Sequence, residues 1–541
     1  MIEGFLCLIL HAHLPFVRHI DKEGELAEEW LYEAITETYI PLIKMMKELI
    51  DEGVDFNLTL NISPPLASML SDELLQQRYR KHLLKLIELS EKELKRTADQ
   101  PKFNRVARMY NDMFKETLYI FHDIYNDNLI QAFKEIRDSG KLELITSAAT
   151  HGYLPLVLTE EAISAQIRTG VETFKKYFDQ DPAGIWLPEC GYKEEIDQIL
   201  AENNIRYFIS SSHGILHAVP RPRYGLYAPI YTPSGVGVFG RDKESSKQVW
   251  SSDEGYPGDL NYREFYRDIG FDLDYDYIKP YLPEGIRKNT GIKYYKITGD
   301  SDYKEVYDPD KARAKTAEHA GNFMFNRKHQ MLHLNQILDR KPIIVAPYDA
   351  ELFGHWWFEG PLWLKYLFKK MHYNEEKIST ITPSEYLNKY KKNQVAKPCE
   401  SSWGYKGYHE VWLNGRNDWI YRHLHEAELK MIKLADKYSD IKDRNSLLYR
   451  SLNQLARELL LAESSDWAFI IKTETMVDYA IDRTKKHLDN FFKLSSQLQE
   501  GIDQSFLERL ERENNIFSFI DFKYYSTRED KNKFMPLRKE G

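Results

Sequence analysis

Cysteine is nearly absent from this 541-residue sequence, which contains only Cys7, Cys190 and Cys399. Three scattered cysteines cannot build the disulfide framework of a small secreted domain, and no two of them have the CxxC spacing of a zinc site. Low cysteine content is typical of proteins in a reducing compartment, so the sequence predicts a cytoplasmic protein.

Long apolar runs and long basic runs are missing as well. No uninterrupted apolar segment approaches the roughly 20 residues that a membrane-spanning helix needs, which argues against a membrane protein. The 74 basic and 83 acidic residues give a formal net charge of -9. Because no run of Lys and Arg could follow a phosphate backbone, nucleic acid is not a predicted partner.

Aromatic residues, in contrast, are abundant: 10 Trp, 36 Tyr and 26 Phe make up 13% of the chain. Most of these rings serve to fill the core of a protein of this size. Sugar rings present flat C–H faces that pack on aromatic faces, so the remaining rings suit a polar cleft for carbohydrate.

Short apolar runs alternate with helical spacing over the first three quarters of the chain, which predicts an α/β fold with a parallel sheet, open or closed into a barrel. The predicted strands are 5–10, 56–62, 142–147, 185–187, 207–210 and 343–346. Helical spacing covers 72–95 and 106–137, and the Pro- and Gly-rich stretch 216–266 predicts irregular structure over a site.

The pattern changes near residue 417 to long amphipathic helices at 418–438, 443–463 and 466–498. No strand alternates with these helices. The sequence therefore predicts a separate helical domain at the C-terminal end.

Two carboxylates stand within three residues of the ends of predicted strands: Glu189 comes after 185–187 and Asp349 after 343–346. The carboxyl ends of parallel strands meet at one edge of a sheet or barrel, where active sites are assembled. Two carboxylates among aromatic residues are what a glycosidase needs, because one attacks or supports the anomeric carbon and the other protonates the leaving oxygen. Taken alone, Glu189 could equally cap a helix.

Two histidines, His11 and His13, close the first predicted strand and point to the same face. Such a pair can bind a metal, hydrogen-bond to substrate hydroxyls, or lie satisfied in the core. A metal-dependent hydrolase that adds Asp349 or His151 as ligand is one alternative to a glycosidase, and a glucan-binding protein without catalysis is another. The intact carboxylate pair argues against the second alternative, and the lack of a further compact His and Asp cluster argues against the first.

Five segments, 11–16, 151–155, 186–192, 346–355 and 402–412, resemble the motif regions of glycoside hydrolase family 57, in order, within the branch of 1,4-α-glucan branching enzymes and related α-amylases. The resemblance implies an incomplete (β/α)7 barrel with a small inserted domain and an all-helical C-terminal domain. The expected division is 1–188 and 233–400 for the barrel, 189–232 for the insertion over the cleft, and 401–541 for the helical domain.

The resemblance also implies a retaining mechanism with Glu189 as nucleophile and Asp349 as general acid/base, without a cofactor or metal. It implies that the substrate is an α-1,4-glucan such as amylose, glycogen or maltooligosaccharides, and we expect a monomer or small homo-oligomer. The further residues expected to contact substrate are the donor-site histidines, the stacking tryptophans and polar residues near them: His11, His13, His151, Trp357, Trp403, Trp412, His355 and Asp466.

Branching enzymes of this family carry a long loop with a tyrosine over the site, and the stretch 231–240 appears in the corresponding place with Tyr231 or Phe239. It matches GxGxxG, but without a βαβ context this pattern does not indicate nucleotide binding. We interpret it as a short mobile loop near the cleft. A short loop predicts an enzyme that forms some α-1,6 branches and also hydrolyses, with a mainly hydrolytic α-amylase as the alternative.

Overall fold

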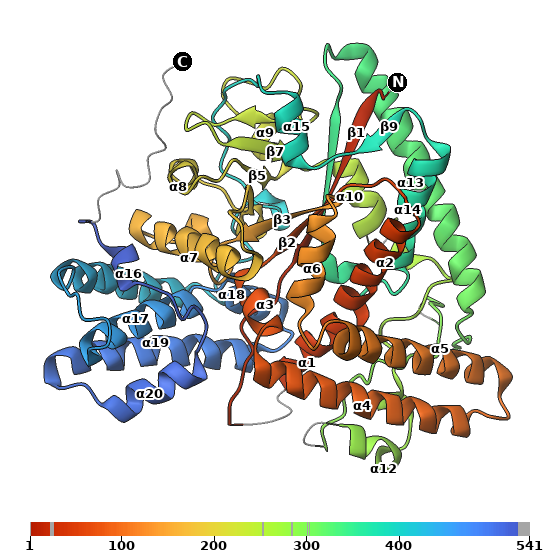
Figure 1. Cartoon of the computed structure of the whole chain (residues 1–541), viewed down its shortest axis with the longest axis horizontal. Coiled ribbons are helices and arrows are strands. Elements are labelled where there is room, and N and C mark those ends of the chain that lie inside the picture. Colours follow the sequence, from red (N-terminus) through yellow and green to blue (C-terminus); the bar gives the residue numbers. More distant parts are fainter. Residues whose placement is uncertain are drawn as a thin grey trace.

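One central sheet lies between helices, and a group of helices follows it at the C-terminal end of the chain (Figure 1). The computed structural model describes residues 2–21, 26–251, 254–282, 285–299, 301 and 303–528. Among these residues, none of the helices combines the length and the apolar character required to cross a bilayer.

The strands pair in the order β6-β7-β5-β4-β3-β2-β1-β8, and β9 also pairs with β1. All neighbours run parallel except β6 and β7, which are antiparallel. Every residue of β1 is buried, which explains its continuous apolar sequence, since both faces of a parallel sheet are covered by helices. The strands are β1 (Gly4–Ala12), β2 (Leu58–Ile62), β3 (Leu142–Ser147), β4 (Gly184–Trp186), β5 (Tyr207–Ser210), β6 (Ile230–Tyr231), β7 (Gly237–Gly240), β8 (Ile343–Asp349) and β9 (Ile378–Thr380).

The sheet curves until the carboxyl end of β7 approaches the first half of β8. There Arg241 and Val345 form a single parallel bridge, and the amide of Asp242 donates to the carbonyl of Val345 at 2.8 Å. Closure by one bridge instead of a full ladder makes this an incomplete (β/α)7 barrel, as expected.

Helices cover both faces of the sheet and extend beyond it. In this part of the chain they are α1 (Leu26–Ala34), α2 (Ile40–Asp51), α3 (Pro64–Leu70), α4 (Glu73–Arg96), α5 (Pro101–Leu118), α6 (Leu129–Asp138), α7 (Glu160–Phe178), α8 (Ile196–Glu202), α9 (Ser212–Leu216), α10 (Lys243–Trp250), α11 (Ile269–Asp272), α12 (Tyr275–Ile278), α13 (Pro309–Ile337), α14 (Gly360–Asn374) and α15 (Pro383–Lys389). The predicted helical stretch 106–137 is divided, because Asn126 and Asp127 adopt positive φ between α5 and α6.

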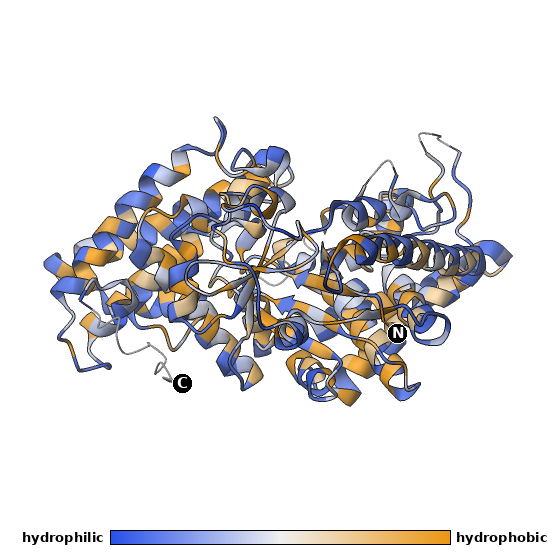
Figure 2. Ribbon diagram, turned by 90° about the horizontal axis from the view of Figure 1, so that it is seen from above, coloured by the Kyte–Doolittle hydropathy of each residue, from blue (hydrophilic) through white to orange (hydrophobic). Residues whose placement is uncertain are grey.

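The C-terminal helices are α16 (Trp419–Lys437), α17 (Leu447–Ala462), α18 (Ser465–Thr473), α19 (Val477–Glu500) and α20 (Gln504–Glu513). Their hydrophilic and hydrophobic residues alternate along the ribbons (Figure 2), as in amphipathic helices with one face on a core. α17 packs against α16 and α19, and the amide of Ser465 at the start of α18 donates to the carbonyl of His151 at 3.1 Å. This contact brings the helical region to the carboxyl edge of the sheet.

The prediction of a mobile loop over 231–240 is wrong. Residues 237–240 form β7, which pairs with β5 inside the sheet, and Ile230–Tyr231 form β6, so only a tight turn at 232–236 remains. The glycines permit close packing here: a Cβ on Gly240 would come within 2.8 Å of Leu226. The expected insertion 189–232 contains β5, which pairs with β4 and β7 in the central sheet; the domain boundaries themselves stay a prediction.

Candidate active site

A cavity of about 400 Å³ opens at the carboxyl ends of β1, β4 and β8. It contains both predicted carboxylates together with residues of the helical region. Its described lining is His11, His13, Leu14, His151, Glu189, Arg241, Trp250, Pro347, Tyr348, Asp349, Glu351, Trp356, Trp403, Gly404, Tyr405, Val411, Trp412, Asp466 and Phe469.

Glu189 lies just beyond β4 in a strained backbone conformation, with φ 61° and ψ 23°. Non-glycine residues rarely adopt this left-handed region, and they do so mainly at functional sites, where surrounding structure holds them. The indole Nε1–H of Trp403 donates to Glu189 Oε2 at 2.7 Å, and the hydroxyl of Ser465 lies 3.4 Å from Oε1. The carboxylate is therefore both held in place and supplied with a hydrogen-bond donor.

Asp349 is the last residue of β8, and in the sheet register it stands next to His11 of β1. Among the described residues, no side chain or backbone amide donates a hydrogen bond to its carboxyl group. A second carboxylate, Glu351, follows two residues later and faces the same cavity.

Burial is the main cause that raises the pKa of both carboxyl groups, to about 7 for Glu189 and about 7 for Asp349. The negative charge of Glu351 raises the pKa of Asp349 further, and Asp349 in turn raises that of Glu189. Two such groups cannot both ionise cheaply in one cavity. Because Trp403 donates to Glu189 and no described group donates to Asp349, we place the negative charge on Glu189 and the proton on Asp349.

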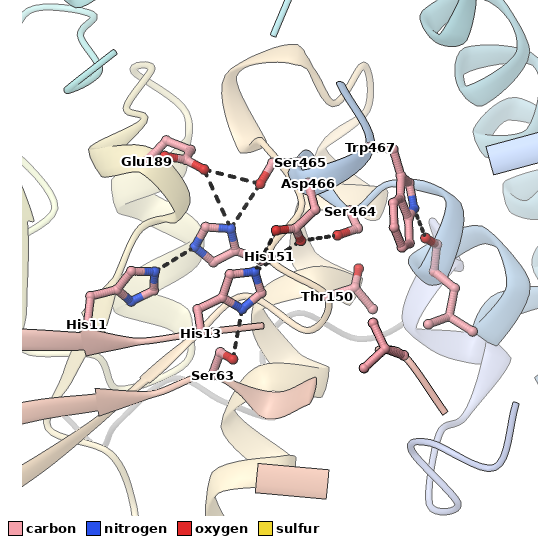
Figure 3. Close-up of polar contacts among 12 residues, drawn as sticks. His11, His13, Ser63, Thr150, His151, Glu189, Ser464, Ser465, Asp466 and Trp467 are labelled. Atoms are coloured by element: carbon pink, nitrogen blue, oxygen red, sulfur yellow. Dashed lines mark hydrogen bonds and ion pairs between the residues drawn. The ribbon is translucent and has the colours of Figure 1, made fainter. Parts of the chain in front are cut away.

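The three predicted histidines meet in this cavity, and a chain of hydrogen bonds connects two of them (Figure 3). Asn61 Oδ1 accepts from His11 Nδ1 at 2.6 Å, so His11 Nε2 accepts from His151 Nε2, 3.0 Å away. His151 Nδ1 then accepts from the hydroxyl of Ser465 at 2.9 Å. Burial lowers the pKa of His11 and of His151, which agrees with two neutral rings in this chain.

These hydrogen bonds determine which group donates to Glu189. The hydroxyl of Ser465 carries one proton, and the shorter of its two contacts directs that proton to His151. Trp403 is therefore the principal donor to Glu189.

His13 lies between Ser63 and Asp466. Ser63 Oγ is 2.9 Å from His13 Nδ1, and Asp466 Oδ2 is 3.0 Å from His13 Nε2 (Figure 3). Ser464 also donates to Asp466 Oδ2 at 2.6 Å. Asp466 thus enters the cavity from the start of α18. Its second oxygen, Oδ1, has one longer contact, with His13 Nε2 at 3.2 Å.

A metal ion could find ligands in the same place. Among the described residues, His13, His151 and Asp466 offer ligand atoms that lie within 4.8 Å of one another. This set differs from the pair His11 and His13 considered from the sequence. Every ring nitrogen of His13 and His151 has a protein hydrogen-bond partner, so hydrogen bonding accounts for the cluster without a metal.

The aromatic predictions divide into two groups. Trp403 and Trp412 line the cavity, although Trp412 is 1% exposed and stacks on Tyr153. Trp357 does not line it, since this side chain is 1% exposed and packs against Phe353 and Trp363. The neighbouring Trp356 is 45% exposed and faces the cavity instead.

Two further predicted contacts lie outside the described cavity lining. His355 Nδ1 is 2.7 Å from Glu37 Oε2, and its ring packs against Phe265. Tyr231 bridges to Val395 at the edge of the sheet. Neither position supports the substrate contact that was expected.

Several lining residues were not among the predicted substrate contacts: Arg241, Trp250, Glu351, Trp356, Tyr405 and Phe469. Arg241 directly follows β7, and it was missed because the glycines of that strand were interpreted as a loop. Had the strand been recognised, a charged residue at its carboxyl end would have been a candidate.

We expect Glu351 to act as a positioning residue for this site, because it lines the same cavity as Asp349 and its charge acts on Asp349. Glu351→Gln should therefore shift the pH profile of activity. Glu351 Oε1 accepts from the hydroxyl of Tyr39 at 2.5 Å and from the amide of His13 at 3.2 Å, and a glutamine oxygen can still accept. Losing the negative charge lowers the pKa of Asp349, so its proton is lost at lower pH. The alkaline limb of kcat/KM should move to lower pH, with roughly a three- to tenfold loss near pH 8.

Glu359→Gln is the matched control. Glu359 Oε1 also accepts from a tyrosine hydroxyl and a backbone amide, those of Tyr307 and Arg263, but it lies outside the cavity lining. This variant should leave the pH profile unchanged. An unshifted alkaline limb in Glu351→Gln would contradict the positioning role.

Two protein-family models match most of this chain. The model of glycosyl hydrolase family 57 matches residues 7–398, and the model of the C-terminal region of 1,4-alpha-glucan branching enzymes matches residues 423–525. A 1,4-alpha-glucan branching enzyme of Thermococcus kodakarensis is 35% identical over 95% of this chain and 77% of its own length.

Two solved structures are similar over nearly their whole length. The alpha-amylase AmyC of Thermotoga maritima is 47% identical, with a TM-score of 0.91 over 96% of this chain and 99% of that one. A branching enzyme of Pyrococcus horikoshii is 34% identical, with a TM-score of 0.87 over 98% of each chain.

Proposed function

The chain belongs to glycosyl hydrolase family 57, and on that premise we propose that it cleaves α-1,4-glucan with retention and passes the glycosyl unit to a sugar hydroxyl, forming α-1,6 branches, or to water. The observation that carries the proposal is the pair Glu189 and Asp349, buried in one cavity with their charges coupled. Among the described residues, Glu189 has a strong hydrogen-bond donor, Trp403, and Asp349 has none.

In the first step Glu189 attacks the anomeric carbon while Asp349 gives its proton to the leaving glycosidic oxygen, which leaves a glycosyl-enzyme. In the second step Asp349, now a carboxylate, removes the proton from an incoming hydroxyl, which attacks the same carbon and releases Glu189. The histidines and Asp466 line the cavity wall on which the sugar that carries the anomeric carbon would lie.

The second step decides between branching and hydrolysis. Bulk water is far more concentrated than any glucan hydroxyl, so transfer needs a closed cleft or a bound acceptor. The turn at 232–236 and the strands beside it contribute nothing to the described lining of the catalytic cavity. This supports an enzyme with both activities.

The test is product analysis on unbranched amylose, carried out with and without a chelator. New α-1,6 linkages, released by a debranching enzyme, and new reducing ends should both appear, at comparable rates and unaffected by the chelator. Branching with negligible hydrolysis would contradict the mixed activity. Activity lost with the chelator and restored by zinc would favour the metal-dependent alternative at His13, His151 and Asp466.

A mainly hydrolytic α-amylase is the second candidate, and the likeness to the Thermotoga maritima alpha-amylase at 47% identity favours it. Reducing ends without any α-1,6 linkage would identify this activity. The two candidates share the first chemical step and differ only in the acceptor.

A further inference from the structure

A second cavity, of about 630 Å³, adjoins the catalytic one. The two share four lining residues, Arg241, Trp250, Trp403 and Gly404, so they lie directly next to each other. None of the site histidines lines the second cavity among the residues described. We call this second space the cationic extension.

Four basic side chains line the cationic extension, Arg241, Lys243, Lys247 and Lys406. Within the described lining there is no carboxylate. Like charges that face one space repel each other, and an anion bound between them relieves this repulsion. The charge pattern therefore indicates an anionic ligand.

The carboxylates outside the lining offset this charge only in part. Lys247 pairs with Glu254 at 2.7 Å and Lys406 with Glu410 at 3.2 Å. The ammonium group of Lys243 forms no ion pair with any described residue. Serine hydroxyls also line this space, but those of Ser212, Ser246 and Ser402 already donate to backbone carbonyls.

Arg241 lines both cavities, so its position shows where the cationic extension lies relative to the catalytic residues. Its guanidinium lies 5.3 Å from the ring centre of Trp403, and its positive charge acts on Asp349. The general acid protonates the oxygen of the leaving chain, so the wall next to Asp349 is the side where that chain, and later the acceptor, lies. A glucan that continues past Trp403 enters the cationic extension.

We infer that the cationic extension is a subsite for a phosphate monoester carried by the α-glucan chain on the acceptor side of Asp349, an inference that rests on the proposed function. A neutral glucan needs hydroxyl partners but no net charge opposite it. A phosphate monoester carries nearly two negative charges and three acceptor oxygens, which match a wall of ammonium and guanidinium donors.

The test compares unbranched α-1,4-glucan with the same glucan bearing phosphate monoesters. We expect the wild-type enzyme to have a KM about three- to tenfold lower for the phosphorylated glucan, and the difference should shrink as salt is added. In the double variant Lys243→Gln/Lys247→Gln the preference should disappear, while kcat and KM on the neutral glucan stay unchanged.

Lys365→Gln/Lys369→Gln is the matched control, because these lysines also stand four residues apart on one helix. Lys365 pairs with Glu48 and Glu52, and Lys369 pairs with Glu52, away from both cavities. This variant should keep the preference. Equal KM values for the two glucans in the wild type would overturn the inference.

A separate arm tests for a free anion. Inorganic phosphate and glucose 6-phosphate are added to reactions on neutral glucan, and we expect little inhibition at millimolar concentration. Strong inhibition by either, together with no preference for the phosphorylated glucan, would overturn the inference, since the site would then take small anions. Failure of the proposed function is distinct, because neither glucan would then be cleaved.

Discussion

Glu189→Gln should lose activity on amylose by about 10⁴-fold or more in kcat/KM, for branching and hydrolysis alike. The amide is nearly the same size as the carboxylate but cannot attack the anomeric carbon. Trp403 can still donate to the remaining oxygen, so the side chain should keep its place. Reducing-end release and α-1,6 formation measure the loss.

Chemical rescue identifies the role and not only the importance of Glu189. With an activated α-glucosyl fluoride as substrate, Glu189→Ala leaves room for azide on the face of the nucleophile, and the product should be the β-glucosyl azide. Glu359→Gln, at a buried glutamate outside the cavity, should keep wild-type activity on amylose. An α-glucosyl azide from Glu189→Ala would contradict the assignment.

The positions of the two carboxylates could be predicted because each stands at the end of a short apolar strand. Glu189 follows β4 and Asp349 ends β8, and parallel strands bring their carboxyl ends to one edge. The same argument holds for His11 at the end of β1. These predictions need only the strand pattern, which depends on local sequence.

The predictions for Trp357 and for the loop failed where orientation depends on distant contacts. Trp356 and Trp357 are equivalent in a sequence, but Trp357 turns into the core against Tyr262 and Trp363, which leaves Trp356 in the cavity. β7 was missed because glycine weakens the alternating pattern of a strand, while its pairing with β5 depends on tertiary structure.

The division of labour between the carboxylates is equally invisible in the sequence. It depends on Trp403, more than 200 positions after Glu189 in the chain, whose indole reaches only that carboxylate, and on Glu351, whose charge acts on Asp349. Such contacts exist only in the folded chain.

Asp349→Asn gives the second large effect, and it should depend on the leaving group. On amylose the loss should be roughly 10² to 10⁴-fold, the usual contribution of a positioned proton donor. On α-glucosyl fluoride, whose leaving group needs little protonation, the first step should be far less impaired. The glycosyl-enzyme should then accumulate, because no base activates the acceptor, and mass spectrometry of the intact protein would detect it.

Azide should restore turnover to this variant with retention, because azide attacks the glycosyl-enzyme without a general base. The expected product is the α-glucosyl azide.

The thermal stability of the variant shows whether it folds normally. Burial raises the pKa of Asp349 to about 7, so the folded state loses stability as pH rises from the ordinary carboxyl pKa toward 7. Asp349→Asn removes that loss and should melt no lower than the wild type near pH 8. Equal impairment on amylose and on the fluoride, without azide rescue, would contradict the acid/base role, since an acid is dispensable only when the leaving group departs unaided.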